Sequence, residues 1–292
     1  MKIKVDLHCH GPNEWRYNPQ KWNPKNLAKL AAERGLNALG IAEMSETDQR
    51  FEKLKLAGKD DPSIYVDCNQ IWVPEYKVLL FRTEEISTKI NGKPQGHVLV
   101  FGNKNKIVKG SLEEVLDKAN EQRADVIAVH AFDGLFDRHF RTLTEGIVGV
   151  CYANSPDKIL DYFNKRMIHA MEYNGALASL SIFNKSIGTE KKNQMAVDFA
   201  RKNNLYLTAS TDAHCVPEMC GDRAYTSFEA PDPISSGDYA DFIRKSLRNF
   251  GNKVVPIMRP GPALCVDNHV GHILAITLLS KIGYNPDKNY LK

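Results

Sequence analysis

Strand-like and helix-like segments alternate along most of this chain, and that alternation limits the fold more than any other feature. Helices are expected between the strands, with Asn23 and Ser111 as helix-starting residues because Asn and Ser cap helix N-termini. Such alternation favours an α/β fold with a largely parallel sheet. Apolar periodicity predicts seven strands, at residues 2–10, 36–43, 77–87, 97–102, 125–130, 168–174 and 205–214.

Each predicted strand ends on a polar side chain. A ring of polar groups at the C-terminal ends of successive strands is how a (β/α) barrel builds its active site. An open sheet would place its site at one switch point instead, and the chain has no Gly-rich nucleotide loop. The sequence therefore favours a barrel. The strand-end residues are His8, His10, Glu43, Glu85, His130, Glu172, Asp212 and His214.

The first strand carries the clearest candidate for a metal site. Asp6, His8 and His10 are spaced two apart, so their side chains share one face of the strand. Imidazole and carboxylate are suitable ligands for zinc, manganese and iron. The alternative is a half-exposed strand whose histidines face water.

Composition narrows the class of protein. The 292 residues are 42% hydrophobic and 25% charged, as in a folded globular protein. The net charge of +4 suits an anionic substrate but does not imply nucleic acid. The apolar run 273–279 is too short for a bilayer, and no export signal is recognised. Six cysteines without a CxxC pair then predict reduced thiols and a cytoplasmic location.

Five short motifs occur in order: DLHCHG, TEEIST, GHVLVFG, VIAVHA and STDAH. Together they resemble the PHP family, the polymerase and histidinol phosphatase domain, over roughly residues 1–225. The resemblance implies a distorted (β/α)7 TIM-like barrel that binds two or three divalent ions of Zn, Mn or Fe and hydrolyses phosphate esters. We expect the barrel to span residues 1–234, with a C-terminal helical extension over 235–292 packed on it.

The resemblance also assigns metal ligands. Glu85 would bridge two ions; it is preferred to Glu84 because it directly precedes Ile86-Ser87. A predicted turn at 91–96 would make the third and fourth strands antiparallel and bring Glu85 beside His97. The first ion would take His8, His10, Glu85 and Asp212, the second Glu85, His97 and His130, and His214 would serve a third position or complete the cluster.

Two departures bear on that third position. The family usually has Thr-Asp-His at the second strand, where this chain has Ala42-Glu43-Met44. Glu43 can still ligate, but a thioether is a poor ligand for these cations. The first loop also lacks the family's further histidine, so two ions are the expectation.

Substrate contacts are expected from the first loop. The aromatic rings of Trp15 and Trp22 could stack on a base or ring of the substrate, and Arg16 and Lys21 could neutralise its phosphate. The alternative is a loop whose aromatic residues pack together as a lid without contacting the substrate. Arg223 is a candidate phosphate ligand. Three other arginines, Arg82, Arg138 and Arg141, compete with it on equal evidence.

These observations predict a metal-dependent phosphoesterase that acts at the C-terminal mouth of the barrel through a hydroxide bridging two ions, most simply a phosphomonoesterase on a small or nucleotide-like substrate. Asp212 and His214 are the expected catalytic residues, with His214 available to protonate the leaving oxygen. The alternatives are a nuclease or nucleotide phosphodiesterase with the same metals, and a non-catalytic metal-binding PHP domain. The expected partner is a small phosphorylated substrate or nucleotide, and no membrane.

Overall fold

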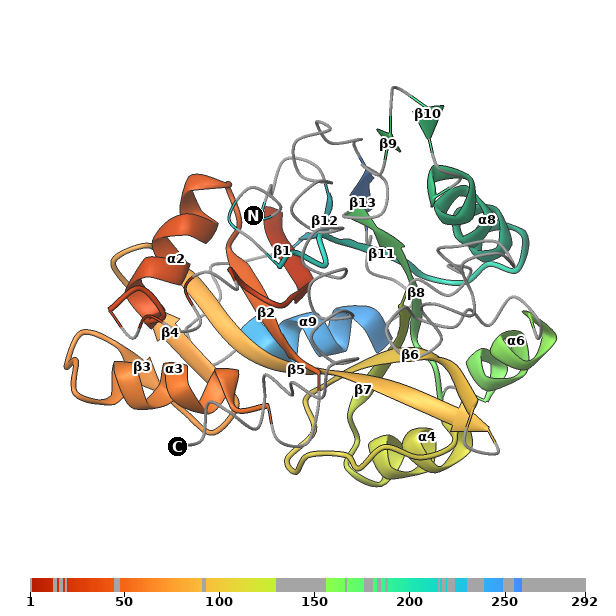
Figure 1. The fold of residues 1–292 in the computed structure, drawn as a ribbon, viewed down its shortest axis with the longest axis horizontal. Helices are drawn as coiled ribbons and strands as arrows, with labels where there is room; N and C mark the ends of the chain where they lie inside the picture. The colour runs from red at the N-terminus through yellow and green to blue at the C-terminus, as the bar shows by residue number, and fades with distance from the viewer. Residues whose placement is uncertain are drawn as a thin grey trace, which may run out of the picture.

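A computed structural model shows a rolled sheet with helices on its outside (Figure 1). The strands run in the order β11-β8-β7-β6-β5-β2-β1-β12-β13, and the first eight of this path form a nearly closed barrel. The expected TIM-like α/β barrel is thus confirmed. The structure describes residues 2–12, 15, 18, 20–44, 48–90, 93–129, 156–165, 167–175, 181–182, 185–186, 189–214, 216, 219, 224–229, 239–248 and 255–258.

The element bounds lie close to those expected. The path strands are β1 (Lys2–Cys9), β2 (Ala38–Glu43), β5 (Val78–Ile90), β6 (Lys93–Phe101), β7 (Asp125–Val129), β8 (Ala170–Asn174), β11 (Leu207–Ser210), β12 (Ala224–Glu229) and β13 (Val255–Met258). The helices are α2 (Pro24–Glu33), α3 (Arg50–Lys59), α4 (Leu112–Glu121), α6 (Pro156–Asn164), α8 (Thr189–Lys202) and α9 (Tyr239–Arg248). Two short pairs, β3 (Tyr65–Val66) with β4 (Gln70–Val73) and β9 (Ser181–Ile182) with β10 (Lys185–Ser186), complete the described elements.

The strand directions are mixed. β1, β2 and β5 run parallel, as do β7, β8 and β11, while β6 runs antiparallel to both β5 and β7. The antiparallel pairing across the turn at 91–96 is therefore confirmed. The sequence prediction omitted the eighth strand, β12, which is antiparallel to β1 at Lys2–Val5. β3 and β4 were also not among the seven predicted strands, because strands of two and four residues are too short to show a period.

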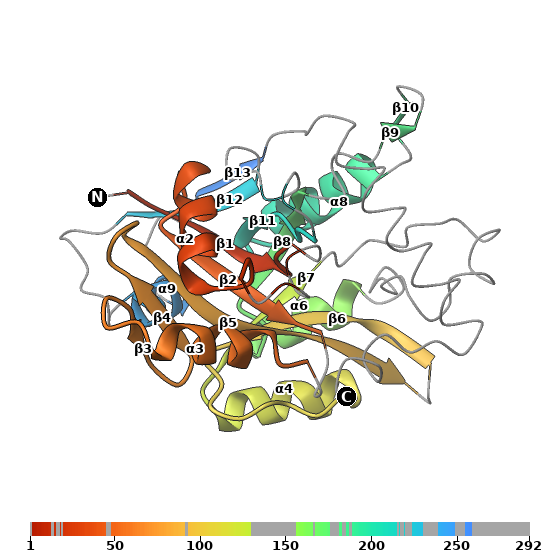
Figure 2. The ribbon, with the colours of Figure 1, turned by 60° about the vertical axis from the view of Figure 1, so that its left-hand side comes forward.

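Capping residues set where two of the outer helices, α2 and α4, begin. The Asn23 side chain accepts a hydrogen bond from the Asn26 amide at 2.9 Å, and Ser111 with Glu114 forms a reciprocal capping box. Figure 2 shows α2 and α3 beside β1, β2 and β5, where Leu27 and Phe51 join one apolar cluster with Leu39 and Leu80. None of the helices in the described ranges combines the length and the apolar character of a membrane span.

α9 closes the end of the barrel opposite the strand C-termini. Its Ile243 is buried in the interior cluster with Ile3, Val5 and Phe101, which lie at that end of their strands. β13 extends the sheet by pairing antiparallel with β12. Both elements come from the range expected as an extension, and we propose that residues 235–292 are packed on the 1–234 barrel in this way; residues 259–292 lie outside the described part.

At the mouth, the barrel closes between β1 and the segment after β11. The Asp212 amide donates to the His8 carbonyl at 2.7 Å, and the His10 amide donates to the Ala213 carbonyl at 2.9 Å. Deeper in the barrel β12 fills the gap: the Thr226 hydroxyl accepts from the Ala209 amide at 3.0 Å and donates to its carbonyl at 3.1 Å. One side chain therefore replaces two ladder hydrogen bonds.

Substituting Thr226→Val should destabilise the protein without changing its shape. The two buried Ala209 groups would lose their partners, and the free energy of unfolding should fall by about 2 kcal/mol or more. Urea denaturation measures this, with Thr226→Ser as a control that keeps the hydroxyl. Equal stability of the Val variant and the wild type would show that the closure does not depend on this side chain.

Candidate metal centre

Four ligand-type side chains converge at the mouth of the barrel. His8 of β1 and His10, directly after β1, point there, joined by Glu85 from β5 and by Asp212, which follows β11. His10 Nε2 lies 3.1 Å from His8 Nε2, 3.2 Å from Glu85 Oε2 and 3.2 Å from Asp212 Oδ1. His8 Nε2 lies 3.4 Å from Asp212 Oδ1 and 3.8 Å from Glu85 Oε2.

These separations suit one metal ion. Ligand atoms at about 2.0–2.1 Å from a tetrahedral zinc ion lie roughly 3.3 Å from one another. The separations among His8, His10 and Asp212 are 3.1–3.4 Å, close to that value. The donor set, two imidazoles and carboxylates, is one that zinc, manganese and iron accept.

The outer partners of the two histidines fix which ring nitrogen faces the centre. His8 Nδ1 lies 2.9 Å from Glu172 Oε1, and His10 Nδ1 lies 3.0 Å from the Ala42 carbonyl oxygen. A carboxylate and a carbonyl can only accept, so in the neutral rings each Nδ1 carries the proton and each Nε2 presents a lone pair. The centre is thus surrounded by acceptors, which a cation satisfies.

Electrostatics lead to the same conclusion. Burial alone would lower the pKa of His8, but the carboxylates of Asp212 and Glu172 hold that pKa well above its usual value. Burial alone would raise the pKa of Asp212, but His8, with hydrogen bonds from His10 and His214, holds it well below its usual value. The buried cluster therefore favours positive charge at its centre.

Glu85 also reaches toward a second position. Its Oε1 lies 2.6 Å from His97 Nδ1, and His97 Nε2 lies 3.0 Å from Ser87 Oγ. His97 pairs in register with Ser87, so Glu85 contacts it diagonally, two residues along the strand. The third expected ligand, His130, follows β7 directly and lies outside the described residues.

His214 flanks the first position from the outside. Its ring stacks on His10 with centroids 4.3 Å apart, and its Nε2 lies 3.5 Å from Asp212 Oδ1. Asp212 itself has a φ of +52°, which L-residues rarely adopt. The turn at Asp212 directs the Asp212 carboxylate toward the histidines and leaves His214 partly exposed.

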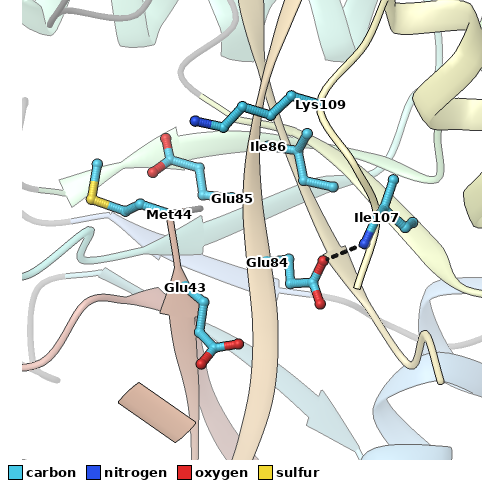
Figure 3. A pocket seen from close by; sticks show the side chains of 7 residues that line it. All are labelled: Glu43, Met44, Glu84, Glu85, Ile86, Ile107 and Lys109. Carbon is cyan, nitrogen blue, oxygen red and sulfur yellow. Dashed lines mark hydrogen bonds between the residues drawn. The ribbon is translucent and has the colours of Figure 1, made fainter. Parts of the chain in front are cut away.

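Glu43 and Glu84 face away from this cluster. Glu43 lies 3.0 Å from Lys106 Nζ and accepts from the Phe51 amide at 3.1 Å, and burial raises its pKa. Glu84 accepts from the Ile107 amide at 3.0 Å and from Asn103 (Figure 3). Of the two adjacent glutamates, it is Glu85 that contacts the histidines. A ligand role for Glu43 stays a prediction that this geometry does not favour.

Asp6 does not join the centre either, although it shares a strand with the histidines. Its carboxylate accepts from the Thr211 amide at 3.1 Å and from the Thr211 hydroxyl, and burial raises its pKa to about 7 despite these bonds. Asp6 therefore ties β1 to the segment that carries Asp212.

Three further residues support the site: Glu172, which the strand-end pattern included without a specific role, and Asn174 and Arg50, which were not predicted. Glu172 also accepts from the Ser210 hydroxyl, Asn174 Nδ2 donates to Asp212 Oδ2 at 2.8 Å, and Arg50 Nη1 donates to the His10 carbonyl at 3.0 Å. Glu172 and Asn174 have the two-residue spacing of a strand end, the signal by which they could be found. Arg50 starts a helix and carries no such signal.

The expected substrate contacts are only partly described. Trp22 is 3% exposed, packs against Gly11 and donates to the Arg50 carbonyl at 3.2 Å, so the packing alternative holds for this residue. Trp15 is partly buried on the same cluster, while Lys21 is exposed. Arg82 is buried and donates to the Asn103 carbonyl. The remaining candidates Arg16, Arg223, Arg138 and Arg141 lie outside the described residues.

Comparison with known proteins agrees with the family resemblance of the sequence motifs. Residues 190–247 match the PHP_C family model, described as PHP-associated, which confirms the resemblance to PHP proteins. Among curated proteins, none matches the chain.

Similar folds occur in solved structures. They include Endonuclease Q complexed with a 27-mer duplex substrate with an abasic lesion at the active site (19% identity, TM-score 0.55) and the lesion-specific endonuclease PfuEndoQ from Pyrococcus furiosus (18%, 0.54). In both, the match covers 87% of this chain and 58% of the other. PsfC from Pseudomonas syringae PB-5123 matches at 15% identity and TM-score 0.56, over 94% of this chain and 99% of PsfC. At these identities the likeness concerns the fold.

Glu172→Gln should weaken metal binding while leaving the protein folded. Removing the charge behind His8 Nδ1 makes His8 a poorer ligand, and loss of such a partner typically costs about 10–100-fold in metal affinity. Titration of the metal-free protein with zinc measures the change, and Glu52→Gln, on an exposed helix surface, is the control. Equal affinities of the two variants would argue against a metal at His8.

Trp22→Ala should reduce stability rather than substrate affinity. Truncating a buried tryptophan costs about 3–5 kcal/mol, whereas Lys21→Ala at the neighbouring exposed position should be nearly neutral. Denaturant unfolding and steady-state kinetics distinguish the two readings. A raised KM with unchanged stability would instead restore Trp22 to a substrate-binding loop.

Proposed function

We propose that this protein is a metal-dependent hydrolase of phosphate esters. The observation that carries the proposal is the convergence of His8, His10 and Asp212 on one point, with Glu85 Oε2 3.2 Å from His10 Nε2. When His8 and His10 are neutral, these facing atoms are acceptors. The coarse class, a hydrolase acting on ester bonds, is also supported by the PHP-associated match and by the fold shared with endonucleases.

The residues have separable tasks in this proposal. His8, His10 and Asp212 would hold one ion, and Glu85 would extend from it to a second ion held by His97 and, from the family resemblance, His130. The ions would be two divalent cations of the zinc, manganese or iron kind, and a third is not required. When bound, they lower the pKa of water and neutralise charge on phosphoryl oxygens.

The leaving group needs a proton, and His214 is placed to give it. Its ring stands at the outer side of the cluster, partly exposed, with Nε2 3.5 Å from Asp212 Oδ1. The Asp212 carboxylate would stabilise the protonated imidazole before the transfer. A histidine titrates near neutral pH and is therefore suited to general acid catalysis.

Two substrate classes follow from this site. A small phosphomonoester or nucleotide fits the modest net charge of +4. A phosphodiester in nucleic acid is favoured by the fold shared with Endonuclease Q, whose complex holds a duplex with an abasic lesion. Because this chain spans 58% of the length of that protein, the activity of the whole relative is not transferred by the match. A third possibility is a metal-binding domain without catalysis, and the metal add-back experiment described next tests it.

Metal-free protein should regain hydrolase activity when zinc, manganese or iron is added back. We would assay nitrophenyl phosphate, bis-nitrophenyl phosphate and an abasic duplex, with metal content measured in parallel. His8→Ala should lose metal and activity together while remaining folded, because barrel stability rests on the packed interior. Two bound ions without hydrolysis of any ester would favour the non-catalytic alternative, and activity that survives His8→Ala would contradict the proposal.

A further inference from the structure

A loop rich in lysine runs beside the metal centre. It connects β6 to α4 over residues 102–111 and carries Lys104, Lys106 and Lys109. A small pocket opens between this loop and the ends of β2 and β5, and Glu85, which also contacts the histidines, is one of its lining residues. Its lining residues are Glu43, Met44, Glu84, Glu85, Ile86, Ile107 and Lys109 (Figure 3).

The loop is anchored to the strand that carries Glu85. The Glu84 carboxylate accepts from the Ile107 amide at 3.0 Å and from Asn103 Nδ2 at 2.9 Å. Ser111 then begins α4 with its capping box. Lys109 lies between these two anchors, two residues from each, so its backbone position is tied to that of the neighbouring Glu85.

The three lysines differ in their surroundings. Lys106 is bound to Glu43 at 3.0 Å and donates to the Asp48 carbonyl, which gives it a structural task. Lys104 and Lys109 are both exposed, but only Lys109 of these two lines the pocket. Figure 3 shows the Lys109 side chain crossing the pocket with its ammonium group on the side of the Glu85 carboxylate and Met44.

An ammonium group in this position has a specific electrostatic consequence. With a divalent ion on Glu85, two cationic centres would face one small pocket, an arrangement that favours an anion between them. A phosphoryl group has the chemistry for this position, because its non-bridging oxygens could contact a metal ion on one side and accept from an ammonium on the other. Lysine suits this task as a compact point charge.

We propose that Lys109 is a substrate-binding residue whose ammonium holds a non-bridging oxygen of the phosphoryl group beside Glu85. This inference rests on the proposed function for the presence of a metal at Glu85. It adds a contact that comes from the loop rather than from a strand end.

The test compares Lys109→Met with Lys104→Met, a matched change on the same loop outside the pocket. Loss of a charge-assisted hydrogen bond should weaken binding of inorganic phosphate to the metal-loaded protein roughly tenfold or more, and raise KM for nitrophenyl phosphate in proportion. Lys109→Arg should recover part of the affinity. Metal content should be equal in all three variants and the wild type.

The outcomes separate this inference from the proposed function. Unchanged phosphate affinity in Lys109→Met, with hydrolysis and metal content intact, would overturn the role of Lys109 alone. Phosphate binding that depends on Lys109 in a protein that hydrolyses no ester would support that role and overturn the proposed hydrolase. A drop in metal content in Lys109→Met would show that the lysine supports the ligands instead, which also overturns the inference.

Discussion

The site depends on the hydrogen bonds that join the end of β1 to residues 211–213. His8 and His10 come from the first strand, and Asp212 comes about 200 residues later in the chain. The Asp212 amide on the His8 carbonyl and the His10 amide on the Ala213 carbonyl hold these two segments in register. Asp6 strengthens the same seam through Thr211. Since the ligands lie on the two sides of this seam, a shift of one residue would separate them.

Each of the three clustered side chains, His8, His10 and Asp212, has a buried hydrogen-bond partner on the side away from the cluster. Glu172 orients His8, the Ala42 carbonyl orients His10, and Asn174 holds the far oxygen of Asp212. Such partners fix the rings and make the ligands more basic. They also leave a buried group of acceptors whose mutual repulsion a cation would relieve, so a metal ion bound at this cluster would stabilise the fold.

Much of this was predictable because strands and their ends leave a strong imprint on sequence. The two-residue spacing of His8 and His10 and the turn before His97 correctly predicted neighbours in space. Glu43 shows the limit: a strand-end position predicts that a carboxylate lies at the mouth, not that a lysine 63 residues later would bind it. The roles of Trp22 and Arg50 could not be predicted either. The burial of Trp22 and the hydrogen bond from Arg50 to the His10 carbonyl both depend on tertiary contacts. β12 was missed because its sequence, AYTSFE, has neither an apolar alternation nor a continuous apolar run.

The place of β12 beside β1 has a consequence for how the protein is made. One edge of β1 can pair with β2 early, but its other edge meets, among the described residues, β12 and the segment after β11. At roughly 5–20 residues per second, a ribosome needs about 10–40 s to synthesise the residues between. During that time the backbone groups on one edge of β1 have no strand to pair with, and unpaired strand edges are prone to pair with other chains. The strand that carries His8 is thus synthesised well before the segments that enclose it.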